Sequence, residues 1–167
     1  MSGTTAIVWR IATDTPYYVA EDTSGKGAEI TGGRWNRAGT PMLYAASSIA
    51  LACLETIVHL DGSLSLPLNR YLVRIEVPQK VWAEAISMPP ASNIGWDALP
   101  TGKVSIDWGD TWCEASRSAL ALVPSVIVPE ELNVLINPRH CDMAKLRMSK
   151  IRKWTYDPRA CGKLASV

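Results

Sequence analysis

Residues 32–60 read "GGRWNRAGTPMLYAASSIALACLETIVHL", and this stretch says the most about the fold. Its pattern predicts a turn, a short apolar strand at 41–45, a two-serine N-cap and a helix over 49–60. Two charged residues stand among apolar neighbours, Arg34 after two glycines and Glu55 inside the helix. A charge in such surroundings costs free energy unless a partner or a ligand compensates for it. Both residues are therefore candidates for a functional site.

The rest of the chain predicts an α+β fold in a single domain, 1–167. The strand 71–77 alternates cleanly, with Tyr71, Val73, Ile75 and Val77 on one face. Strands and helices do not follow one another as regular βαβ units, which favours a mostly antiparallel sheet with flanking helices. Asp61 and Gly62 are expected to end the helix over 49–60. Further strands are expected at 6–13, 121–129, 133–138 and 146–156, helices at 107–120 and 141–146, and irregular segments at 22–33 and 86–103.

Composition excludes several classes of protein. The 167 residues include 17 Lys and Arg against 16 Asp and Glu, a formal charge of +1, so no electrostatic footprint for nucleic acid is present. No apolar run approaches the ~20 residues that span a bilayer. The first residues lack the basic and apolar regions of a signal peptide. Together these features predict a cytoplasmic protein that binds neither nucleic acid nor membranes directly.

The four cysteines, Cys53, Cys113, Cys141 and Cys161, stand far apart and form no CxxC pair. We expect reduced thiols, without a disulfide and without a metal site. His59 and His140 are too few and too widely spaced to indicate metal binding, and there is no phosphate-binding P-loop or GxGxxG motif.

Pattern alone leaves two interpretations for each candidate residue. Arg34 is either a surface arginine or a clamp for phosphate or carboxylate. Glu55 is either a solvated helix residue or a carboxylate directed into a pocket, because it lies beside the expected apolar stripe of Ala50, Cys53, Leu54, Ile57 and Val58. Tyr44 is either a core aromatic or a stacking platform for a flat ring. Ser125 is either a backbone-bonding serine or a site residue, and it lacks the G-x-S-x-G context of a hydrolase nucleophile.

A family resemblance favours the functional interpretation of all four. The segment "GGRWNRAGTPMLYAASSIALACLE" closely resembles the signature of the RES domain family, the toxin half of bacterial toxin–antitoxin pairs. Arg34, Glu55 and Ser125 match the arginine, glutamate and serine for which the family is named, and Tyr44 matches its tyrosine. Further blocks agree in order and spacing, namely "VWRI", "SGKGAEITGGRWN", "IDWGDTWCEASRSALALVPSVIVP", "NVLINP" and "YDPR". The sequence departs from the family where "NRAGT" replaces the usual proline after the asparagine, and at Leu132 and Val134, where aromatics are common.

The resemblance implies an ADP-ribosyltransferase-like fold that cleaves the nicotinamide–ribose bond of NAD, with NAD as substrate and no prosthetic group. In such a site Glu55 would stabilise the cationic ribose, and Arg34 would bind the pyrophosphate. Tyr44 would stack on nicotinamide or shape its pocket, and Ser125 would orient a ribose hydroxyl or the carboxamide. The resemblance also implies an Xre-type antitoxin that covers the active site, within an oligomeric toxin–antitoxin complex.

Several points stay open at this stage. The acceptor is water, inorganic phosphate or a protein side chain, because all three need the same carboxylate. The alternatives to an NAD-degrading toxin are an ADP-ribosyltransferase that modifies a protein, or an inactive member that binds a nucleotide or a partner. The sequence assigns no role to Arg10, Tyr17, Tyr18, Asn36 and Asn133.

Overall fold

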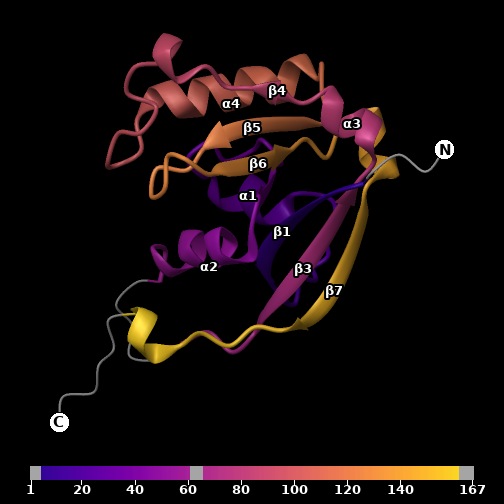
Figure 1. The fold of residues 1–167 in the computed structure, drawn as a ribbon, viewed down its shortest axis with the longest axis vertical. Coiled ribbons are helices and arrows are strands. Elements are labelled where there is room, and N and C mark those ends of the chain that lie inside the picture. Colours follow the sequence, from indigo (N-terminus) through magenta and orange to yellow (C-terminus); the bar gives the residue numbers. More distant parts are fainter. Residues whose placement is uncertain (1–4, 61–65, 162–167) are drawn as a thin grey trace.

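The computed structural model describes residues 5–60 and 66–161, which build one seven-stranded sheet in the order β4-β5-β6-β2-β1-β3-β7 (Figure 1). All neighbouring strands are antiparallel except β4 and β5. The strands are β1 Ala6–Thr13, β2 Leu43–Ala46, β3 Arg70–Val77, β4 Ile86–Ser87, β5 Leu120–Pro124, β6 Leu132–Ile136 and β7 Arg147–Lys153. The helices are α1 Lys26–Thr31, α2 Ile49–Ile57, α3 Gln79–Ala83 and α4 Lys103–Ala115, with short 3-10 turns at Pro90–Ser92, Cys141–Lys145 and Pro158–Cys161. The predicted α+β class with a mostly antiparallel sheet is confirmed.

Alternation along β3 builds the main core. Val73, Ile75 and Val77 are completely buried on one face and pack with Val8 of β1 and Val134 of β6. Each fully buried aliphatic side chain contributes roughly 1.5–3 kcal/mol relative to an exposed one. The predicted face of β3 is therefore confirmed, and this core fixes the position of β1 in the sheet.

A second core lies between α4 and β5 and is built from indole rings. Trp108 and Trp112, four residues apart on α4, stack with ring centroids 6.5 Å apart. Trp35 meets Trp108 edge-on at 5.8 Å and stacks on Trp96 at 6.3 Å. Because Trp35 follows Arg34 directly, this cluster anchors the turn that carries the arginine.

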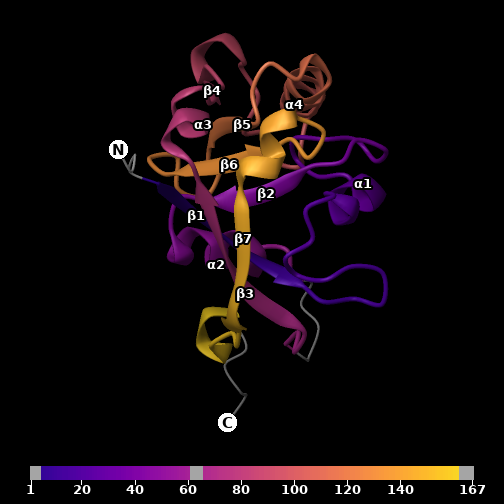
Figure 2. The same ribbon diagram turned by 90° about the vertical axis from the view of Figure 1, so that its right-hand side faces the viewer.

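The sheet opens between β1 and β2. These strands share a single residue pair, Trp9 with Ala46, whereas β1 pairs with β3 along its whole length. Beyond that pair β1 and β2 diverge, and Figure 2 shows β6 running at a steep angle to β3 and β7. The divergence leaves residues 10–13 and 43–45 facing a gap that strand pairing does not fill.

Some boundaries differ from prediction for local reasons. The expected irregular segment 22–33 contains α1, a six-residue helix that follows Gly25 in the left-handed region (φ 71°). The strand predicted over 121–129 ends at Pro124, because proline has no N–H to continue a ladder. The helix predicted over 107–120 runs over α4 instead.

Helix α2 begins as predicted, with the Ser48 side chain accepting a hydrogen bond from the Leu51 N–H. Its expected buried stripe is confirmed at Cys53 and Ile57, which pack against the core, and is wrong at Ala50 and Val58, which are exposed. Leu51 and Ala52 are buried instead. The cause is tertiary: the helix packs its Leu51 side on β1 and β3 and leaves another face toward the gap in the sheet. The expected stop at Asp61 and Gly62 lies outside the described residues. None of the helices in the described ranges is long and apolar enough to cross a membrane.

Candidate active site

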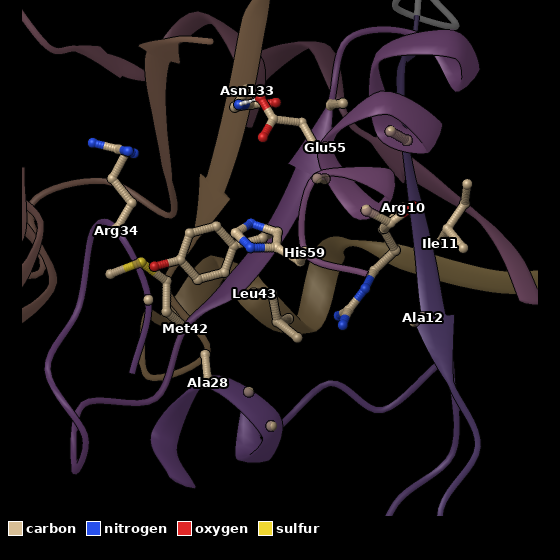
Figure 3. Close-up of a pocket in the computed structure, with 18 of the residues that line it drawn as sticks. Arg10, Ile11, Ala12, Ala28, Arg34, Met42, Leu43, Glu55, His59 and Asn133 are labelled. Carbon is tan, nitrogen blue, oxygen red and sulfur yellow. Dashed lines mark hydrogen bonds between the residues drawn. The ribbon is translucent and has the colours of Figure 1, made fainter. Parts of the chain in front are cut away.

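A cavity of about 500 Å³ occupies the gap between β1 and β2 (Figure 3). Its size is within the usual range for small-molecule sites. The divergent strands form two of its walls, α2 closes a third side, and the glycine-rich segment around α1 closes another. Three of the four predicted site residues line it, namely Arg34, Tyr44 and Glu55, together with Arg10, His59 and Asn133 among others.

Glu55 projects from α2 with one carboxylate oxygen held in place. Its Oε1 accepts hydrogen bonds from the Ser125 hydroxyl at 2.7 Å and from the Asn133 amide at 2.5 Å. The Ser125 hydroxyl also accepts from the backbone N–H groups of Ile127 and Val128, both at 3.1 Å, so its proton is directed at Glu55. Within the described ranges Oε2 has no such partner, which leaves it available to a ligand.

Ser125, the fourth predicted site residue, lies behind the cavity wall. Ser125 is completely buried and does not line the cavity, and its hydroxyl is saturated by three hydrogen bonds. Its geometry positions Glu55 rather than a ribose hydroxyl or a carboxamide. Asn133, which the sequence left unassigned, shares this contact from β6.

Arg34 lies at the edge of the cavity and is hydrogen-bonded to a loop that is distant in the sequence. Its Nη1 donates to the carbonyl oxygens of Trp96 at 3.2 Å and Ala98 at 3.0 Å. Partial burial lowers the pKa of the Arg34 guanidinium, which the Glu55 carboxylate partly offsets. Among the described residues, Nε and Nη2 have no hydrogen-bond acceptor. That edge of the guanidinium therefore remains for an anionic ligand.

Tyr44 and Asn36 hold the turn that carries Arg34. The Tyr44 hydroxyl accepts from the Trp35 N–H at 3.0 Å and donates to Asn36 Oδ1 at 2.6 Å. The Asn36 amide donates to three carbonyl oxygens, including that of Ala28 in α1. Burial raises the pKa of the Tyr44 hydroxyl, so the group does not ionise near neutral pH. The Tyr44 ring lines the cavity and is a surface on which a flat ring can stack.

Arg10 is a site residue that the sequence reasoning missed. Its side chain comes from β1 and points into the cavity, away from Arg34 in Figure 3. Burial lowers the pKa of Arg10 to about 10, so the group remains a cation at neutral pH. Its Nε and Nη1 are buried and have no hydrogen-bond partner in the described part of the chain. Arg10 carries the same sequence signal as Arg34, because it is a charged residue inside an apolar run.

One cluster of metal-binding side chains lies outside the cavity. Ligand atoms of His140, Cys141 and Asp142 fall within 4.8 Å of one another. However, His140 Nδ1 accepts from the Asp142 N–H at 3.1 Å, and the Asp142 carboxylate pairs with Lys145 at 2.5 Å. These contacts cap and close a 3-10 turn, so the structure gives the residues a local role. Cys113 and Cys141 are free cysteines.

Comparison with known proteins shows that the chain belongs to the RES domain family, whose model matches residues 7–158. The chain is 59% identical over 156 residues to the "Prs ADP-ribosylating toxin" of Sphingobium sp. (strain YBL2), covering 93% of this chain and 96% of that protein. It is 40% identical over 123 residues to "Toxin Res" of Yersinia enterocolitica, covering 74% and 79% of the two chains.

A solved structure has a similar fold. The crystal structure of the M. tuberculosis MbcT–MbcA toxin–antitoxin complex contains a chain that superposes with a TM-score of 0.66. The match covers 97% of this chain and 90% of the other at 16% identity, a level at which it supports the fold alone.

Proposed function

We propose that this chain is the toxin of a toxin–antitoxin pair and acts by cleaving the nicotinamide–ribose bond of NAD. The observation that supports this most directly is one cavity holding a carboxylate with a free oxygen, from Glu55, and two guanidiniums with unused donors, from Arg10 and Arg34. A dinucleotide with a diphosphate and a cationic glycosidic end carries the charges that complement this set.

The reaction needs electrostatics and positioning more than proton transfer at the leaving group. Nicotinamide leaves NAD as a neutral ring because the bond-breaking electron pair cancels its positive charge. The ribose meanwhile gains oxocarbenium character, as in glycoside cleavage. The free Oε2 of Glu55 would stabilise that developing charge, and the hydrogen bonds from Ser125 and Asn133 would fix its direction.

Arg10 and Arg34 would bind the diphosphate from two sides of the cavity. The family resemblance implies this contact for Arg34 alone, but Nη1 of Arg34 already donates to the loop at 96–98. Arg10 offers a guanidinium whose buried Nε and Nη1 have no hydrogen-bond partner among the described residues, and an anionic ligand would compensate for its desolvation. The Tyr44 ring would stack on the nicotinamide. The proposal requires no prosthetic group.

The name of one relative favours protein ADP-ribosylation over simple loss of NAD. That relative is called an ADP-ribosylating toxin and is 59% identical to this chain. We therefore place transfer of ADP-ribose to a protein first, with hydrolysis or phosphorolysis of NAD as the second candidate. Both begin with the same bond cleavage.

An antitoxin segment would cover the cavity mouth. The related fold was solved as a toxin–antitoxin complex. Tyr17, Val19 and Ile30 are exposed apolar side chains beside the cavity wall, where Tyr18, Val19 and Thr31 are lining residues. A partner segment with apolar side chains for this rim and a carboxylate for Arg34 would exclude NAD.

The test is nicotinamide release from NAD by the purified chain, with and without phosphate and with added protein acceptors. Glu55→Gln should bind NAD with little change and lose turnover, because the lost charge matters most in the transition state. Arg34→Ala should also weaken binding, since the diphosphate is charged throughout. Ser105→Ala, a buried serine on α4 outside the cavity, is the matched control and should retain turnover.

A second test expresses the chain in cells. The chain alone should arrest growth and lower NAD or modify a protein with ADP-ribose, and the neighbouring antitoxin should reverse both effects. Intact NAD under every condition would reject the enzyme and leave the inactive binder as the better explanation.

A further inference from the structure

His59 is a titratable group in the cavity to which the proposed reaction gives no task. It lies four residues after Glu55, in the turn that follows Ile57, the last residue of α2. Both residues line the cavity, together with Ala52 and Thr56 of α2. In Figure 3 the His59 imidazole points into the cavity on the same side as the Glu55 carboxylate.

No structural contact explains this placement of His59. Within residues 5–60 and 66–161 its imidazole makes no hydrogen bond or ion pair, and the side chain is exposed rather than part of a core. By contrast, His140 caps a 3-10 turn through Nδ1. An imidazole that lines a ligand cavity and has no hydrogen-bond partner among the described residues is free to exchange a proton there.

Charged side chains from several elements line the cavity together with His59. Helix α2 contributes Glu55, β1 contributes Arg10, and β3 contributes Arg70. The turn before β2 contributes Arg34, and the loop after β1 contributes Asp22.

We propose that His59 is the general base for the acceptor, and that the acceptor is a nucleophile carrying a proton, either water or a protein side chain, rather than phosphate dianion. This inference rests on the proposed cleavage of NAD. Phosphate dianion attacks without losing a proton and would leave His59 idle. Water, a hydroxyl or an ammonium must lose one.

With a hydroxyl acceptor, one bond forms, one bond breaks and one proton is transferred. The acceptor oxygen forms a bond to the anomeric carbon of the ribose, and the bond from that carbon to the nicotinamide nitrogen breaks. The electron pair of the broken bond neutralises the nicotinamide ring. The acceptor proton moves to a nitrogen of His59, and solvent later removes it from the imidazolium.

The experiment compares wild type with His59→Gln, which keeps a polar side chain and cannot act as a base. Turnover of NAD should fall by about 10²-fold, within the usual range for a lost general base, with KM and the calorimetric Kd for NAD changed less than about twofold. Wild-type turnover should decline toward acid pH, as for a reaction that needs a base, and the variant should lose this dependence. Val58→Ala, at an exposed neighbouring position, is the control and should behave as wild type.

Two acceptor conditions separate the sources of the proton. The assay in buffer alone measures transfer of ADP-ribose to water, and the assay with an added protein measures ADP-ribosylation. The turnover of His59→Gln should fall under whichever condition gives wild-type turnover. Unchanged turnover in His59→Gln, or wild-type turnover that requires phosphate, would overturn the assignment alone. A wild type that releases no nicotinamide would overturn the proposed function and this assignment with it.

Discussion

At the scale of single residues, the site depends on which polar atoms are satisfied and which are not. Glu55 Oε1, the Ser125 hydroxyl and the Asn36 amide are all hydrogen-bonded, which fixes them. Arg10 is the opposite case, a buried guanidinium with Nε and Nη1 unpaired among the described residues. Such buried atoms cost folding free energy, which the charge of Asp22 offsets in part, and a bound anion would compensate for the rest.

Arg10→Met should therefore separate stability from binding. Removing an unpaired buried cation should leave the free energy of unfolding unchanged or raise it by about 1–3 kcal/mol. The affinity for NAD should fall at least about tenfold, because a charge-assisted contact is lost. Denaturant unfolding and calorimetric titration measure the two effects.

Arg147→Met, at an exposed position on the edge strand β7, should change neither quantity appreciably. If Arg10→Met instead destabilises the fold strongly and leaves NAD affinity intact, the cation has a structural role and the assignment of Arg10 to the diphosphate fails.

At the scale of elements, the turn carrying Arg34 is positioned by how closely α4 approaches it. A Cβ atom added to Gly109 would lie 1.9 Å from the carbonyl oxygen of Trp35. Only glycine therefore allows the helix to contact that backbone, and the contact places the indole cluster under the turn. A helix otherwise disfavours glycine by roughly 1 kcal/mol relative to alanine.

Gly109→Ala should push the turn and α4 apart. We expect a loss of about 1–3 kcal/mol in unfolding free energy, the usual cost of overpacking, and weaker NAD binding as Arg34 moves. Thermal unfolding and NAD titration would detect both changes. Gly102→Ala is the control, because the added Cβ would meet its nearest neighbour at an ordinary 3.4 Å. Equal stability of the two variants would contradict this packing argument.

At the scale of the whole molecule, ion pairs between side chains connect distant strands of the open sheet. Lys150 of β7 binds Asp14, just after β1, with its ammonium 2.9–3.0 Å from both carboxylate oxygens, and also contacts Glu21 at 3.1 Å. The hydrogen bond from Lys150 is the main reason that the pKa of Asp14 lies below its ordinary value. A carboxyl group whose pKa is depressed by folding stabilises the protein above its unfolded pKa.

Lys150→Met should make unfolding less dependent on pH at the acid end. The stabilisation from Asp14 is present above about pH 4 and is lost as the pH falls through the depressed folded value. The melting temperature of the variant should lie below that of wild type at pH 7, and the difference should shrink as the pH falls below the unfolded pKa of about 4. A difference independent of pH would show that the lost cation–π contact with Tyr71, and not the ion pair with Asp14, is responsible.

The sequence determined much of the fold because its elements follow local patterns. Alternation in β3, the Ser48 cap of α2 and the stacked pair Trp108 and Trp112 depend on residues close together in the chain. The charges Arg34 and Glu55 were visible for the same reason, since each interrupts an apolar run. Their placement in one cavity followed from the family resemblance and not from any local pattern.

Only the tertiary structure decided how those residues work together. Ser125 and Asn133 are hydrogen-bonded to Glu55 although they lie 70 and 78 positions away in the sequence. Because β1 diverges from β2, the side chain of Arg10 on β1 lines the cavity. Hydrogen bonds between distant residues and a gap between strands have no short-range signature. They arise when the sheet twists and its pairing fails, which is a property of the packed molecule.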